Sequence, residues 1–261
     1  MSNYYYLASL LPPLDFPSQG DIGLEGLEEA LRINLSSEDM EQVRVLRLQV
    51  DLSNIQLLLQ EEEIDPRGNL DEKALEEVLL EQTFFPEYVW DFLQTHETLV
   101  QRARYFPALL HQFFEEEASK HTGFLRAFFT FEREWRLVML ALRAKKLRRD
   151  VVTELQFEDP TDPLIMHILA QKDAEQYEPP LEYKELKDLW VSCGPDPWQQ
   201  AKSIASYRFR KIHDIAEEVT EGLQFTMCLI LAYLAQLMIV EQWRGLSEQR
   251  GRLFLDRVKT S

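Results

Sequence analysis

Glycine, cysteine and cations are all scarce in this chain of 261 residues, and each scarcity argues against a class of protein. Nine glycines, against abundant Leu, Glu, Arg, Ala and Gln, make a composition typical of helices rather than sheets. The two cysteines, Cys193 and Cys228, share no metal or redox spacing, and they fit a reducing cytoplasm better than a disulfide scaffold. With 28 cations against 45 acidic residues, the net charge is -17, so nucleic acid and anionic lipid would repel the protein. We therefore expect a cytoplasmic, helical protein with no nucleic-acid partner.

Long apolar runs are scarce too, and one segment, residues 223–240, approaches the ~20 residues that a membrane-spanning helix needs. Two glutamines and a threonine interrupt it, Glu221 and Glu241 flank it, and no cluster of Lys or Arg sets an orientation. We expect it to be a buried core helix, with no direct membrane span. The start of the chain has no basic segment before its apolar stretch, so we expect no secretory signal and a start that remains in the mature protein.

Apolar residues make up 45% of the chain, enough for a sizeable core, and two segments place them at alternating spacings of three and four residues. This spacing is the apolar stripe of a packed helix. The first stripe is Val45, Leu48, Leu52, Ile55 and Leu59, and the second is Phe128, Phe131, Trp135, Val138 and Leu142. We predict an all-α, multi-helix bundle that forms a single helical domain over residues 1–261, with a subdivision near 150–180 left open.

Proline and glycine mark the breaks between the predicted helices. Residues 65–68 read Asp-Pro-Arg-Gly, a turn sequence, and Asn69 with Glu72 offers a capping pair for the next helix, which predicts a helical hairpin over 38–82. Pro86 and Pro107 indicate helix starts near each of them. Further breaks are expected at Pro160, Pro163, residues 179–180 and a loop over 192–198.

The two apolar stripes also match each other without a gap. Setting Leu52 against Trp135 places Asp51 on Glu134, and both segments are followed by an acidic turn that contains proline. One interpretation is an internal duplication of a helical unit. The other is coincidence, because stripes of this kind match between any two amphipathic helices. The sequence leaves both open.

No residue pattern in the sequence predicts a catalytic centre, a cofactor or a metal site. None of the five histidines falls in an HExxH or ExxH arrangement, and Gly-rich phosphate loops, Walker lysines and nucleophile elbows are missing. The acidic runs 61–63 and 115–117 are interpreted as solvated faces, because adjacent residues on a helix point in different directions. The histidines are interpreted as structural; they are His96, His111, His121, His167 and His213.

Positive charge concentrates at one place in this acidic chain. The basic cluster consists of Arg143, Lys145, Lys146, Arg148 and Arg149. It either supplies favourable charge at a helix C-terminus or docks onto an acidic partner, and the two roles are compatible. A second candidate contact is the aromatic start at residues 4–6, which either packs the first segment against the bundle or faces a partner.

Three segments spread along the chain carry a family resemblance. They read NYYYLASLLPPL near the start, FEREWRLVMLALRAKKLRRD in the middle and IVEQWRGLSEQRGRLFLDRVK near the end. Together they resemble a bacterial family of proteins associated with V/A-type ATP synthases. In the last segment, the residues that match the family pattern are Glu241, Trp243, Leu246, Gly251 and Phe254.

A more distant similarity is to the C subunit of V/A-type ATPases, which is also called subunit d. It is a helical protein that couples the central stalk to the membrane rotor ring. DLSNIQLLL at 51–59 and LRAKK at 142–146 are similar to segments of that family. The resemblance implies a non-catalytic C-like stalk subunit or accessory adaptor, whose partners are subunits of an ATP synthase that transports protons or sodium. It also implies a cytoplasmic protein held peripheral to the membrane through that complex. Two alternatives remain: a helical scaffold unrelated to the ATPase, and an enzyme with its site in a helical cleft.

Overall fold

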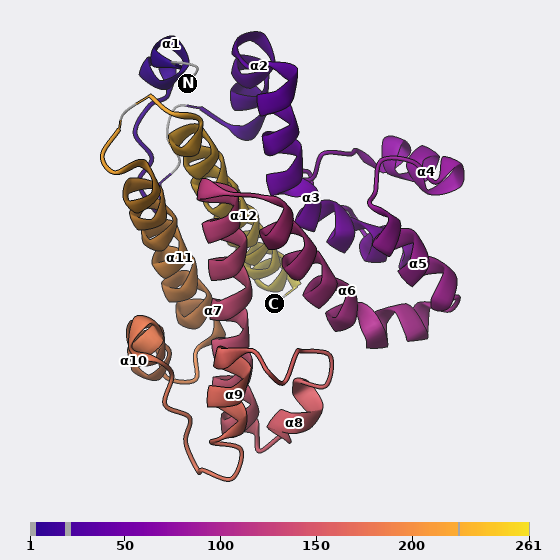
Figure 1. Cartoon of the computed structure of the whole chain (residues 1–261), viewed down its shortest axis with the longest axis vertical. Helices are drawn as coiled ribbons and strands as arrows, with labels where there is room; N and C mark the ends of the chain where they lie inside the picture. Colours follow the sequence, from indigo (N-terminus) through magenta and orange to yellow (C-terminus); the bar gives the residue numbers. More distant parts are fainter. Residues whose placement is uncertain (1–3, 19–21, 224, 261) are drawn as a thin grey trace. The chain divides into compact units, whose positions relative to one another are not determined.

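The structure is a computed structural model that describes residues 4–18, 22–223 and 225–260, with side chains described as far as Gln249. Within these ranges it contains twelve α-helices, one 3₁₀-helix and no strand (Figure 1), which confirms the all-α, multi-helix prediction. The first helices are α1 Tyr5–Leu10, α2 Leu24–Asn34, α3 Ser37–Leu59, α4 Glu72–Glu81, α5 Glu87–Thr95, α6 Leu99–Lys120 and α7 Gly123–Leu147. The later elements are α8 Val151–Glu154, α9 Pro163–Leu169, η1 Leu181–Tyr183, α10 Lys184–Ser192, α11 Pro197–Thr220 and α12 Met227–Thr260.

The chain divides into two compact units. The first unit combines residues 1–43 with 188–261, and the second unit is the continuous segment 44–187. Their boundaries fall inside α3 and α10, which each run from one unit into the other. The single domain over 1–261 and the subdivision near 150–180 stay predictions.

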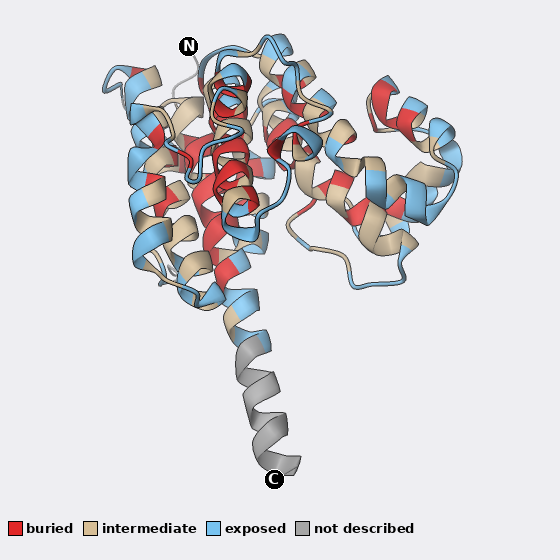
Figure 2. Ribbon diagram, turned by 90° about the horizontal axis from the view of Figure 1, so that it is seen from below, coloured by how far each residue is buried: buried red, intermediate tan, exposed pale blue. Residues whose placement is uncertain are grey.

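The first unit is built on the hairpin of α11 and α12, whose helices pack along each other. Asp196 caps α11, accepting a hydrogen bond from the backbone N–H of Trp198, and Pro197 follows at the first helical position, where its missing N–H is harmless. The hairpin turn uses left-handed backbone at Glu221 and Gly222. Buried positions, red in Figure 2, run along α12 from Ile230 to Val240.

The apolar segment 223–240 therefore lies largely in the core, as expected. Its first residues differ from the prediction, because the helix begins only at Met227 and Leu223 is 56% exposed in the preceding turn. Of the helices in the described ranges, none has the length and apolar character needed to cross a membrane.

The second unit is built on the hairpin of α6 and α7, joined by only two residues. Phenylalanines hold its two helices together: Phe113 of α6 and Phe129 of α7 are both fully buried, with ring centroids 5.3 Å apart in an edge-to-face arrangement. The second apolar stripe lies on α7, so the long helix predicted there is confirmed.

Two predicted helix starts were wrong. Pro107 lies inside α6, which instead begins at Leu99 because Thr98 and Gln101 form a reciprocal capping box upstream. The cap of α4 is Asp71, whose carboxylate accepts from the backbone N–H of Ala74 at 2.8 Å, and Asn69 is used elsewhere. Pro86 is the N-cap of α5, as the sequence indicated.

Candidate functional site

The basic cluster, the first of the two candidate contact sites in the sequence, lies at the C-terminal end of α7. Lys145 and Lys146 occupy the last helical turn, where positive charge stabilises the partial negative charge of the helix end. Arg148 follows as the C-cap in left-handed backbone. The cluster therefore lies at a helix C-terminus, where favourable charge was expected. Docking of the cluster onto an acidic partner stays a prediction.

Contacts within the second unit engage part of this cluster. The Lys145 ammonium donates to the backbone carbonyls of Lys172 and Ala174, at 2.5 and 2.7 Å. Arg149 forms an ion pair with Glu154 at 3.5 Å. Arg143, Lys146, Arg148 and Arg149 are exposed, and Lys145 is partly buried. Lys145 and Arg149 help to hold the chain that follows α7.

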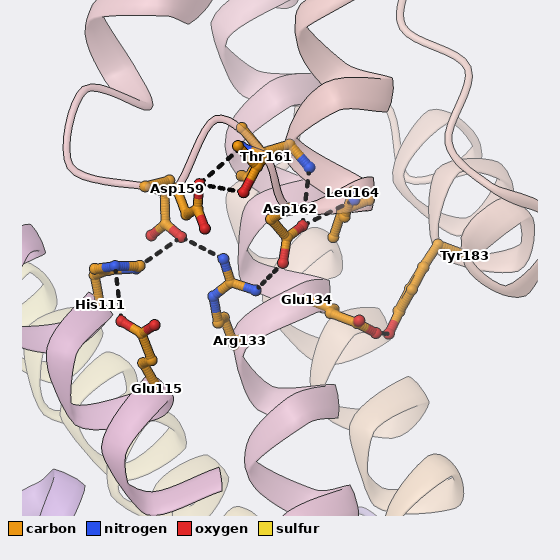
Figure 3. A network of polar contacts seen from close by, with 11 residues as sticks. His111, Glu115, Arg133, Glu134, Asp159, Thr161, Asp162, Leu164 and Tyr183 are labelled. Atoms are coloured by element: carbon orange, nitrogen blue, oxygen red, sulfur yellow. Dashed lines mark hydrogen bonds and ion pairs between the residues drawn. The ribbon is translucent and has the colours of Figure 1, made fainter. Parts of the chain in front are cut away.

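A second polar site, which the sequence did not predict, joins α6 and α7 to the segment between α8 and α9 (Figure 3). Glu158 is its centre: one carboxylate oxygen lies 3.0 Å from His111 Nδ1 on α6 and 2.7 Å from an Arg133 guanidinium nitrogen on α7. Another guanidinium nitrogen of Arg133 lies 2.9 Å from Asp162, which caps α9. All four side chains are at least three-quarters buried, with 13 to 23% exposure.

The charges of this network reinforce one another. The hydrogen bond with Glu158 raises the pKa of His111 against the opposing effect of burial, and Glu115, 3.4 Å from Nε2, adds to the rise. Burial alone would raise the pKa of Glu158, but His111 and Arg133 outweigh it and lower that pKa. The sequence offered two local signals: the Asp162-Pro163 helix start, and His111 four residues before Glu115 on one helix face.

A third polar site holds the loop after α3. Asp51 is fully buried and accepts from the backbone N–H groups of Asn69 and Leu70, at 2.7 and 3.2 Å, and from the Asn69 side chain at 2.6 Å. Asn54 pairs with both backbone groups of Asp65, at 2.8 and 2.9 Å. Burial raises the pKa of Asp51, and its hydrogen bonds oppose that rise. This loop clamp gives the D-x-x-N part of the segment 51–59 a structural role.

Glu134, which aligns with Asp51, also binds a later segment of the chain. Its carboxylate accepts from the Tyr183 hydroxyl at 2.5 Å, and burial raises its pKa. Leu137, aligned with Asn54, is a buried apolar residue. The order of a long helix, two short helices and a long helix occurs as α3 to α6 and, with the short α8 and the 3₁₀-helix η1 added, as α7 to α11. The duplication itself stays a prediction.

The acidic runs behave differently from each other. Residues 61–63 are exposed, as predicted. The prediction was wrong for Glu117, which is 4% exposed and forms ion pairs with Lys120 at 3.6 Å and His121 at 3.2 Å. Its burial follows from helical periodicity, because Glu117 lies four residues after the buried Phe113 and shares its face of α6.

The remaining histidines have local partners. His96 stacks on Tyr105, His167 bonds to the Glu178 carbonyl at 2.8 Å, and His213 lies 3.3 Å from Glu217. In the described part of the chain, no group of three or more His, Cys, Asp or Glu side chains is arranged to hold a metal ion. The cysteines Cys193 and Cys228 are free and partly buried.

The aromatic start packs within the first unit, and a contact of it with a partner stays a prediction. The Tyr4 hydroxyl donates to Asp39, and Leu7 is buried, so the segment packs within the first unit. Tyr5 and Tyr6 are 60% and 66% exposed and remain accessible to a partner. In the late motif, Trp243 is buried and its ring centroid lies 4.2 Å from that of Trp198, while Gly251 and Phe254 lie beyond the residues whose side chains are described.

Comparison with known proteins places the chain among bacterial relatives. A protein of Chlamydia muridarum (strain MoPn / Nigg), described as uncharacterized, is 27% identical over 97% of this chain and 96% of the relative. Similar proteins of Chlamydia trachomatis serovar D and Chlamydia pneumoniae are 26% and 27% identical, over 97% and 99% of the chain and 96% and 98% of their own lengths. No solved structure matches. The model of DUF2764, described as a protein of unknown function, matches residues 1–260, and the chain therefore belongs to the DUF2764 family.

Proposed function

We propose that this protein is a non-catalytic, C-like stalk subunit or accessory adaptor of a bacterial V/A-type ATP synthase. It acts through protein contacts in rotary coupling or in assembly, and binds no nucleotide itself. The observation that carries the proposal is the resemblance of its first, middle and last segments to proteins associated with that ATP synthase. Because these segments span nearly the whole chain, the resemblance concerns the entire protein rather than one shared helix.

The use of buried carboxylates supports a structural rather than a catalytic role. Catalytic acids and bases converge on a site with perturbed pKa values and room for a substrate. Among the described residues, the buried carboxylates are Asp51, Glu117 and Glu132, and each is engaged within the fold. Asp51 holds a loop, Glu117 pairs with Lys120 of its own helix and with His121 directly after it, and Glu132 pairs with Arg136 at 2.9 Å.

The exposed cations at the end of α7 supply a contact surface for an acidic partner subunit. In a chain with net charge -17, most of the surface would repel such a partner, so the orientation of docking would depend on this end of α7. Lys146 and Arg148 are the residues to test because both are exposed at the helix end. Arg149 is exposed too, but it pairs with Glu154, and Lys145 donates to the backbone of the later chain.

Affinity purification of the full-length, tagged protein from a bacterium that carries a V/A-type ATP synthase tests the proposal. Recovery of ATP synthase subunits, identified by mass spectrometry, is expected. The absence of these subunits under gentle, low-salt conditions would contradict the proposal and favour the helical scaffold unrelated to the ATPase. Hydrolytic or transferase activity of the isolated protein would instead favour the enzyme alternative.

A charge-reversal pair then tests the docking surface. Lys146→Glu with Arg148→Glu is expected to reduce recovery at low salt, because complementary charges across an interface set association rates that salt screens. The matched control is Arg32→Glu with Lys73→Glu, which reverses the same number of exposed cations elsewhere. Equal recovery of both double variants would assign the cluster to helix-end stabilisation alone.

A further inference from the structure

Both ring nitrogens of His111 face a carboxylate, an arrangement that suits its charged form best. Its Nδ1 lies 3.0 Å from Glu158 and its Nε2 lies 3.4 Å from Glu115. A neutral imidazole has one N–H donor and one lone pair, so one of the two carboxylates would face a lone pair. The doubly protonated ring donates toward both. The geometry therefore couples the protonation of His111 to the contact between α6 and the segment 155–162 (Figure 3).

The other contacts of that segment with the α6–α7 hairpin include aromatic packing and ion pairs with Arg133. Phe157 lies edge-to-face against Tyr105 of α6, with ring centroids 5.8 Å apart, and Leu155 is buried. Glu158 is shared between His111 and Arg133, and Asp162 also contacts Arg133. When His111 loses its charge, the ionic attachment of the segment to the hairpin depends on Arg133, which belongs to α7 rather than to α6.

The charged groups around His111 favour its protonated form. On its own helix it faces Glu115, and from the segment it faces Glu158, with Asp159 and Asp162 nearby. Arg133, from α7, is the cation that opposes them. Glu158 and Glu115 outweigh burial and the opposing Arg133, and they keep the imidazolium stable beyond the range of an isolated histidine.

We propose that His111 is a pH-dependent latch, which fixes the segment 155–162 on the α6–α7 hairpin when both ring nitrogens are protonated and loosens it when one proton leaves. The latch goes beyond the proposed function and does not depend on it. Because folding raises the pKa of His111, its contribution to stability is complete below the ordinary histidine value near 6.5 and is lost as pH rises through the higher value of the folded protein.

Hydrogen exchange of the backbone amides of 155–162 in the full-length protein tests the latch. After correction for intrinsic exchange, protection is expected to fall about two- to fivefold between about pH 5.5 and about pH 8.5, the range that a partly exposed ion pair supports. His111→Gln, which cannot become charged, is expected to show no such fall. The matched control is His213→Gln, which removes an exposed histidine paired with Glu217 at the same i,i+4 spacing and should leave the response intact.

A second variant and a direct titration keep the test independent of how well His111→Gln folds. Glu115 is 67% exposed, so Glu115→Gln should leave the fold intact, reduce the pH response and lower the pKa of His111 measured by NMR. The latch is overturned by a pH response of 155–162 that is the same in wild type and His111→Gln. It is equally overturned by a wild-type segment whose protection does not change with pH, or by a His111 that titrates at or below the ordinary value.

Discussion

Replacing Asp51 with alanine should destabilise the second unit more than any surface substitution. The side chain is fully buried and accepts hydrogen bonds from two backbone N–H groups and one side-chain amide. Each buried donor left without a partner costs about 1–3 kcal/mol, and the three donors share one loop, so their losses are not fully additive. We expect Asp51→Ala to lower the free energy of unfolding by about 3–5 kcal/mol, a large part of the ~5–15 kcal/mol typical of a domain.

Urea unfolding followed by tryptophan fluorescence measures this loss, and hydrogen exchange locates it at the amides of Asn69 and Leu70. The matched control is Asp71→Ala, which removes an exposed carboxylate with a single hydrogen bond to the backbone N–H of Ala74. Loss of that cap should cost about 0.5–2 kcal/mol. If Asp51→Ala were no more destabilising than Asp71→Ala, or left the exchange at Asn69 and Leu70 unchanged, the loop clamp would not contribute as described.

Three further outcomes follow from the packing. Gly68→Ala should lower the free energy of unfolding by about 1–3 kcal/mol, since its Cβ would lie 2.5 Å from Asp51 Oδ1. Gly245→Ala should raise that free energy by about 0.5–1 kcal/mol, because its Cβ would meet nothing within 4 Å outside its own helix backbone. Urea unfolding measures both changes. Thr98→Ala should lower the free energy of unfolding by about 0.5–2 kcal/mol, because it removes the capping box. Hydrogen exchange at Gln101 and Arg102 that is as slow in this variant as in the wild type would contradict that role. The wild-type protein should be released from membranes by carbonate, because residues 230–240 are largely buried within the first unit; carbonate-resistant insertion would refute this.

The helices were predictable because their periodicity is local. The stripes around Leu52 and Trp135 each reported a helix correctly, since apolar side chains three and four residues apart must share one face. The sequence predicted a loop over 192–198 and a break at Pro163, but α11 and α9 begin at Pro197 and Pro163, each behind an aspartate cap. An aspartate followed by proline is a local signal of a helix start, because it needs no partner distant in the sequence.

The polar sites were not predictable because their partners are distant in the sequence. Nothing near Asp51 shows that it binds the N–H groups of residues 69 and 70, and Asn69, which resembles a helix cap, is taken by that carboxylate instead. Glu158 reaches His111 across 47 residues, so only the folded α6–α7 hairpin brings them together. Pro107 shows the same limit, since an upstream capping box started the helix before the proline.

Cross-linking mass spectrometry in intact bacteria tests the central claim most directly. With a short amine-reactive reagent, Lys146 at the end of α7 is expected to form cross-links with subunits of the V/A-type ATP synthase. The Lys146→Arg variant keeps the charge but lacks the amine, so it should lose these cross-links and retain those from the other lysines. Reproducible cross-links from this protein's lysines to proteins outside the ATP synthase, with none to its subunits, would contradict the account.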